Sequence, residues 1–156
     1  MEKDCLTQVK EFHQRFEHPI LPTPTIPDAK RCALRVSLLV EELKELQVAI
    51  ENNDIVEVAD AFCDLEYVLS GAILELGMGD KFPELFSEVH RSNMSKACKT
   101  LQEAEDTIKF YLEKDGTESY FKEKNGFYLI YRKSDNKTLK SINYSPADFK
   151  SILEIK

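Results

Sequence analysis

The sequence contains no long run of apolar residues, so it lacks the stretch of about 20 residues that would cross a bilayer as a helix. Its four cysteines are far apart and include no Cys-x-x-Cys pair, which argues against a zinc site. The opening residues, MEKDC, lack the apolar segment of a signal peptide. These absences predict a cytoplasmic protein with no membrane partner, whose cysteines are reduced and mostly fill the core.

An excess of positive charge is also missing. The chain carries 28 acidic and 21 basic residues, a formal net charge of −7. This balance argues against a general binder of nucleic acid or of anionic membranes. A length of 156 residues with 42% hydrophobic residues fits one soluble domain. We therefore expect a single domain over residues 1–156, with a core at about 3–100 and a C-terminal extension at about 117–156.

Apolar residues recur at helical spacing through most of the chain. A proline-rich stretch, residues 18–27, contains four prolines and cannot form a regular helix, so it is expected to connect two helices. Asp28 is positioned to cap the helix that follows, and Gly77 to end a later one. The pattern predicts helices at residues 3–16, 28–52, 54–76, from 82 into the segment 90–96, and 101–114.

The C-terminal residues change character. Residues 127–132 alternate in the manner of a strand, residues 134–136 favour a turn, and residues 138–142 follow as a possible second strand. A last short helix is predicted at residues 147–155. The fold class is thus an all-α antiparallel helical bundle with a small C-terminal β-hairpin.

Two carboxylate clusters stand in consecutive predicted helices. Glu42 and Glu45 share one helix face, because residues three or four apart lie on the same side of a helix. Glu57, Asp60 and Asp64 share a face of the next helix for the same reason. The link at residues 52–54 is short, so the two helices should be antiparallel neighbours and the acidic faces can meet.

Burying these acids side by side would be costly. Apolar residues flank them, and burial together with like charge should raise their pKa values. A hard divalent cation would remove the cost, because it takes several oxygen ligands at once. A solvated acidic face is the alternative, since polar stripes normally cover surface helices. We favour a metal site because the acids interrupt apolar helices.

Other polar residues near these clusters are open to two interpretations. Arg31 and Arg35 lie on the same stripe as the first acids, where they would either contact phosphate or serve as surface or neutralising charges. Tyr67 follows the second cluster and would be either a core residue or a ligand contact. The segment HRSNMSK, residues 90–96, concentrates different donors and is either a solvated helix end or a segment that faces a ligand.

The pattern E-E-x-x-E followed by E-x-x-D resembles the signature of the all-α nucleoside triphosphate pyrophosphohydrolases, the MazG-like superfamily. Here it comprises Glu41-Glu42-Leu43-Lys44-Glu45 and Glu57-Val58-Ala59-Asp60. HRSNMSK is similar to a segment of one subgroup, and Asn143-Tyr144-x-Pro146-x-Asp148 faintly resembles that subgroup's tail. The resemblance covers residues 6–96 well, whereas the long insertion that follows Lys96 departs from the pattern.

This resemblance implies Mg²⁺-dependent hydrolysis of a nucleoside triphosphate between its α and β phosphates, with Mn²⁺ as a possible substitute. It implies that Glu42, Glu45, Glu57 and Asp60 hold the metal. Glu41 or Asp64 would accept the proton of water or hold a second metal. The implied substrate contacts are Arg31, Arg35, Tyr67, His90, Arg91, Asn93 and Lys96.

Three other functions compete with this one. A related activity is that of phosphoribosyl-ATP pyrophosphohydrolase, which shares the reaction but not the substrate. A di-metal bundle for oxygen chemistry is disfavoured, because neither acidic helix contains a histidine. A non-catalytic helical interaction module has no reason to concentrate carboxylates between apolar faces.

The helix pair over residues 28–76 cannot cover its own apolar faces, so we expect a homodimer or a dimer of dimers.

Overall fold

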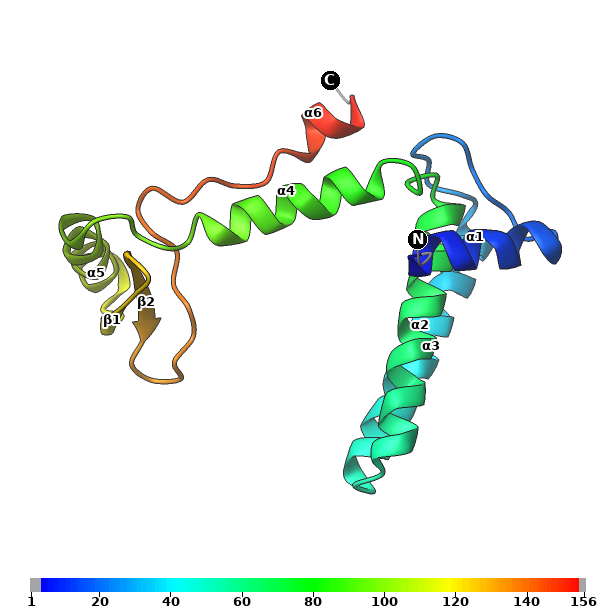
Figure 1. The fold of residues 1–156 in the computed structure, drawn as a ribbon, viewed down its shortest axis with the longest axis horizontal. Coiled ribbons are helices and arrows are strands. Elements are labelled where there is room, and N and C mark those ends of the chain that lie inside the picture. The colour runs from blue at the N-terminus through cyan, green and yellow to red at the C-terminus, as the bar shows by residue number, and fades with distance from the viewer. Residues whose placement is uncertain (1–3, 155–156) are drawn as a thin grey trace. The chain divides into compact units, whose positions relative to one another are not determined.

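The computed structural model describes residues 4–154, and the chain divides into two compact units, one ending at Phe82 and one beginning at Pro83. It is mostly helical with a small antiparallel hairpin in its C-terminal half, which confirms the predicted fold class. The elements, labelled in Figure 1, are α1 (Cys5–Arg15), α2 (Ala29–Glu51), α3 (Ile55–Glu75), α4 (Phe82–Met94), α5 (Leu101–Asp115), β1 (Ser119–Lys124), β2 (Phe127–Arg132) and α6 (Phe149–Leu153).

The unit boundary falls inside the core predicted at residues 3–100. A single domain over residues 1–156 stays a prediction. The predicted helix ends at Lys3 and Ile155 lie outside the described residues.

The N-terminal unit is built on the antiparallel pair α2 and α3, which pack along each other (Figure 1). The Asp28 carboxylate caps α2 by accepting bonds from the backbone N–H groups of Lys30 and Arg31, both at 3.0 Å. Asp54 caps α3 in the same way, and Asn53 turns the chain with a φ of 53°. These caps explain why both helices match their predicted bounds to within one residue.

The proline-rich connector, residues 18–27, has no helix or strand, as predicted. Its backbone is tied to the end of α3, because the N–H of Leu21 donates to the Leu74 carbonyl at 3.1 Å and that of Thr25 to the Leu76 carbonyl at 2.9 Å. Helix α1 also packs against α3. The connector therefore fixes where α2 starts relative to the end of α3.

Gly77 ends α3 beneath this connector, and its replacement should be costly. Its φ is +70°, and a Cβ there would stand 1.8 Å from the Thr23 carbonyl oxygen. We expect Gly77→Ala to lower the free energy of unfolding by more than about 2 kcal/mol, because the strain of a left-handed L-residue adds to a backbone clash. Gly116 is the matched control: its φ is +72°, with nothing within 4 Å of the added atom.

Gly116→Ala should cost only the conformational strain, about 1–2 kcal/mol. Denaturant titration followed by circular dichroism measures both variants. Equal losses in the two would contradict a clash with the connector.

The C-terminal unit corrects the predicted hairpin. Residues 127–132 do form a strand, but their partner is β1, which precedes them, with Tyr120 paired to Tyr131. Asn125 and Gly126 make the connecting turn with φ values of 52° and 77°. Two consecutive residues with positive φ suit the right-handed twist of paired strands, so Asn-Gly is a strong hairpin signal that the prediction overlooked. Of the predicted second strand, only Thr138 forms a bridge, to Tyr131.

A small apolar core holds α5 against this hairpin. It consists of Cys98, Ala104, Ile130 and Leu139, with partly buried neighbours packed around it. Only Cys98 fills a core, since Cys5 and Cys63 are exposed and Cys32 is partly exposed, so the prediction for the cysteines was wrong for most of them. The last helix is shorter than predicted and follows a cap at Asp148.

Within residues 4–154, no helix is both long enough and apolar enough to span a membrane.

Candidate active site

The acidic residues of the motif lie on α2 and α3 and surround Glu42. Glu42 is half-buried, and its Oε2 atom is buried without a hydrogen-bond partner. Burial raises the pKa of Glu42, and the negative charges of Asp64, Glu45, Glu41 and Asp60 raise it further. Because two of these four come from α3, the predicted meeting of the two acidic faces is confirmed around Glu42, as is its raised pKa.

The other acids of the motif are exposed within the chain. Glu45 and Glu57 line one groove of about 390 Å³ between the ends of α2 and α3, together with Asp54 and Asn52. Within residues 4–154, no three acidic, histidine or cysteine side chains converge closely enough to hold a metal ion as they stand. The donor set nevertheless suits a hard cation, since Glu42 presents a buried carboxylate oxygen with no partner beside four other carboxylates.

Arg31 and Arg35 do not turn to these acids but to Glu75, near the end of α3. The Nε of Arg31 donates to Glu75 Oε2 at 3.2 Å, and both guanidinium groups contact Glu75 Oε1. Glu75 is 1% exposed. Burial acts to raise its pKa, but the bonds and charges of the two arginines outweigh burial, and the pKa is lowered.

Glu75 is a residue that the sequence reasoning missed. Its signal was a single carboxylate in the apolar end of a helix, which needs a partner if it is buried. The same network includes His13, which is buried and contacts the Pro19 carbonyl through Nδ1 at 3.1 Å. Gly71 allows this packing, because a Cβ there would stand 2.9 Å from Arg35 Nη1 and 3.0 Å from His13 Nε2.

Tyr67 lies on α3 beside α1. Its ring meets Phe12 edge-on, with centroids 5.6 Å apart and planes at 81°. It lines a mostly apolar pocket of about 330 Å³ between the two helices, together with Gln8, Phe62 and Glu66. Tyr67 is therefore neither a buried core residue nor a fully solvated one, and its ring is open to a ligand.

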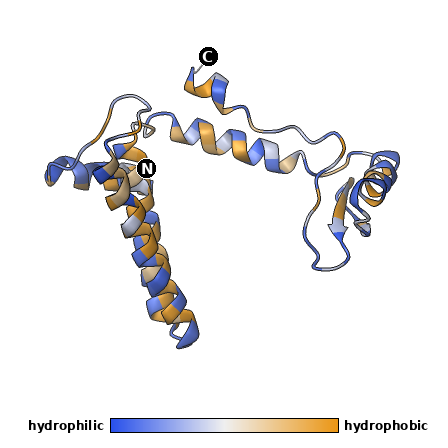
Figure 2. Cartoon of the chain, turned by 180° about the vertical axis from the view of Figure 1, so that it is seen from behind, coloured by the Kyte–Doolittle hydropathy of each residue, from blue (hydrophilic) through white to orange (hydrophobic). Residues whose placement is uncertain are grey.

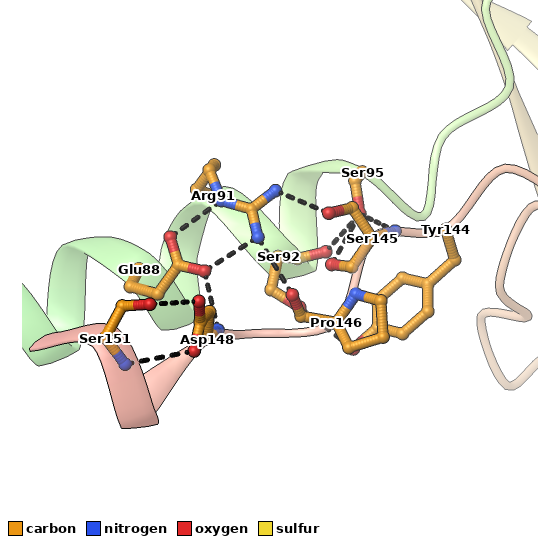
Figure 3. Close-up of polar contacts among 9 residues, drawn as sticks. All are labelled: Glu88, Arg91, Ser92, Ser95, Tyr144, Ser145, Pro146, Asp148 and Ser151. Carbon is orange, nitrogen blue, oxygen red and sulfur yellow. Dashed lines mark hydrogen bonds and ion pairs between the residues drawn. The ribbon is translucent and has the colours of Figure 1, made fainter. Parts of the chain in front are cut away.

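The HRSNMSK residues belong to the C-terminal unit, and five of them lie within α4 rather than after it. His90 and Asn93 are exposed, and Lys96 Nζ donates to Asn93 Oδ1 at 2.7 Å. Arg91 forms an ion pair with Glu88 at 2.7 Å and also donates to Ser145 Oγ and the Pro146 carbonyl, both at 3.0 Å (Figure 3).

These contacts bind the C-terminal tail, here the residues from Tyr144 onward, along α4. The Arg91 guanidinium, together with the backbone N–H of Asp148, holds the pKa of Glu88 at about 2. Ser95 adds a bond from the backbone N–H of Ser145 at 2.9 Å (Figure 3). In this structure Arg91 thus anchors the tail, while His90 and Asn93 are exposed and Lys96 is partly exposed.

Comparison with known proteins identifies the class. The helical fold and the paired acidic motif are those of the all-α nucleoside triphosphate pyrophosphohydrolase superfamily. Within it, residues 9–93 match the model of the phosphoribosyl-ATP pyrophosphohydrolase family, and the chain belongs to this family. The match confirms the resemblance inferred from the sequence, and it includes every predicted site residue except Lys96.

An uncharacterized protein of Acanthamoeba polyphaga mimivirus is 37% identical to the chain over 95 residues. The matched region covers 56% of this chain and 38% of the viral protein. The chain thus spans well under half the length of this relative.

Proposed function

We propose that the protein is a pyrophosphohydrolase that cleaves a nucleoside triphosphate between its α and β phosphates, giving a nucleoside monophosphate and pyrophosphate. Membership of a pyrophosphohydrolase family supports the reaction class. The observation that carries the proposal is the buried, unpartnered Oε2 of Glu42 among four other carboxylates, an arrangement that a divalent cation would stabilise.

In this proposal Glu42, Glu45, Glu57 and Asp60 hold Mg²⁺, or Mn²⁺ in its place. When bound, the ion would orient the triphosphate and neutralise part of its charge. Glu41 or Asp64 accepts a proton from the attacking water, because the negative charges of both act on Glu42. Their exposed oxygens remain available for this role, since neither is engaged by a cationic side chain within residues 4–154.

The remaining predicted contacts would hold the substrate. Lys96 and Arg91 would stabilise charge on the departing pyrophosphate, and His90, Asn93 and Tyr67 would contact the sugar or the base. For Arg31 and Arg35 the structure supports a role in neutralising Glu75. An arginine that also contacted phosphate would have to bind Glu75 and the phosphate with the same guanidinium group. Arg31, whose side chain is 31% exposed, is the better placed of the two.

Phosphoribosyl-ATP is a second candidate substrate, favoured by the description of the matched family. It would undergo the same cleavage, because it also carries a triphosphate.

The decisive experiment is a panel of canonical and modified nucleoside triphosphates together with phosphoribosyl-ATP, scored for pyrophosphate release with Mg²⁺. We expect release from at least one nucleoside triphosphate, and none when the metal is chelated. Preference for phosphoribosyl-ATP over the whole panel would select the second candidate. Absence of pyrophosphate from every compound would refute the proposed reaction.

We also propose that α2 and α3 pair with a second copy of the chain. Figure 2 shows hydrophobic residues along the whole length of the pair, and Val36, Ile55, Val56 and Phe62 are all more than half exposed in the single chain. Covering such apolar area is worth about 25 cal/mol per Å². We expect light scattering at micromolar concentration to give a dimer or tetramer, and Val36→Glu to shift it toward the monomer. A parental mass of 18.0 kDa would contradict the assembly.

A further inference from the structure

Two lysines come together where α4 ends and the C-terminal tail begins to return. The backbone N–H of Ser141, next to Lys140, donates to the Lys96 carbonyl at 3.1 Å, so the two residues lie on adjoining segments. The ammonium of Lys140 stands 4.2 Å from the centre of the Tyr144 ring. Lys140 therefore places a positive charge against the Tyr144 ring, and Lys96, whose Nζ donates to Asn93 Oδ1 at 2.7 Å, lies on the adjoining segment.

Tyr144 connects the two lysines to α4. Its hydroxyl shares a hydrogen bond with Ser92 Oγ at 2.9 Å (Figure 3). The bond with Ser92 lowers the pKa of Tyr144 most, and the positive charges of Lys140 and Lys96 lower it further. The positive charges of both lysines thus act on the same phenol.

Four other cations of this unit are paired with acids among the described residues, including Lys109 with Glu113. Arg91 pairs with Glu88, Arg132 with Asp135, and Lys133 with Glu118. Within residues 4–154, neither Lys96 nor Lys140 has a carboxylate within ion-pair distance.

Glu103 accepts a bond from Ser141, the residue after Lys140, but its carboxylate oxygens are already engaged. It accepts the Ser141 hydroxyl and, at 2.8 Å, the backbone N–H of Lys99. Two positive charges that act on one phenol also repel each other, and the bond from Lys96 Nζ to the neutral Asn93 Oδ1 does not neutralise either of them. An anion bound between them would remove this cost.

We infer that Lys96, Lys140 and the hydroxyl of Tyr144 form a binding site for the diphosphate group of a nucleotide or for free pyrophosphate. Each ammonium offers up to three donors as a compact charge, which suits phosphoryl oxygens. Two ammonium groups match two linked phosphoryl groups better than one orthophosphate. That the bound anion comes from the cleaved nucleotide rests on the proposed function. That the site binds pyrophosphate does not.

Isothermal titration of the full chain with inorganic pyrophosphate, in the presence of a chelator, tests the site. We expect Lys140→Gln to weaken binding about tenfold, the effect of losing one charge-assisted contact. Lys140→Arg should retain most of the affinity. Lys124→Gln, which makes the same charge change at the exposed end of β1, should alter affinity less than about twofold.

Parental affinity in Lys140→Gln, or no pyrophosphate binding by the parent at millimolar concentration, would overturn the site. Orthophosphate binding as tight as pyrophosphate binding would overturn the assignment to a diphosphate. The titration involves no turnover, so its result is separate from the proposed reaction. A protein inactive on every nucleotide but with Lys140-dependent binding would refute the reaction alone, and the reverse outcome would refute this site alone.

Discussion

Glu42→Gln is expected to lower the rate of pyrophosphate release at least about 100-fold while the protein stays folded. A metal acting as a Lewis acid contributes several kcal/mol to the transition state, and each 1.36 kcal/mol is a factor of ten. The substitution keeps the shape of the side chain and removes one anionic oxygen from the proposed ligand set. Glu45→Gln, Glu57→Gln and Asp60→Asn are expected to act in the same direction.

None of these variants should be less stable than the parent. Each removes one charge from a group of mutually repelling carboxylates, and the new amide of Glu42→Gln can donate to its acidic neighbours. Adding Mg²⁺ should raise the melting temperature of the parent, because an ion that binds only the native state stabilises it. That rise should shrink in all four variants, whereas Glu41→Gln should retain it and lose rate if Glu41 is the base.

Glu51→Gln is the matched control for charge, since Glu51 lies on the same helix, is exposed, and accepts a bond from the Gln47 side chain at 2.8 Å. It should leave both rate and metal response unchanged. Near-parental turnover of all four ligand variants at saturating Mg²⁺ would show that the acids form a solvated face and not a metal site.

Glu75→Gln is expected to lower the free energy of unfolding at neutral pH by about 3 kcal/mol or more. Removing one partner of a buried ion pair leaves the other charge uncompensated, and here Arg35 is itself buried with its Nε lacking a partner. Arg31 loses one of its two bonds to Glu75 as well, because the amide keeps a single acceptor oxygen. Denaturant titration of the parent and of the variant gives the difference.

The loss should depend on pH in a defined direction. The pKa of Glu75 is lower in the folded protein than in the unfolded chain, so its stabilisation is complete above the unfolded value. It is lost as the pH falls through the folded pKa. The difference between parent and Glu75→Gln should therefore shrink on acidification, whereas Glu51→Gln should stay within about 0.5 kcal/mol of the parent throughout. A variant as stable as the parent at neutral pH would contradict a stabilising role for this network.

Local signals explain which parts of the fold could be predicted. Helices α2 and α3 were placed to within a residue because Asp28 and Asp54 bond the first free N–H groups of each helix. The hairpin was misplaced because alternation alone does not say which neighbour a strand pairs with. The Asn125-Gly126 turn decided the pairing, since its positive φ values favour the preceding segment as the partner.

The sequence by itself determined that two acidic faces exist on two antiparallel helices, because periodicity and a short link require it. Only the tertiary structure decided that Glu42 is the buried member of the group, since this depends on how far one helix is shifted along the other. The same holds for Glu75, whose partners lie 40 and 44 residues away and become neighbours only when α3 packs along α2. Lys96 and Lys140 likewise meet only because the tail returns along α4, a contact that no local pattern encodes.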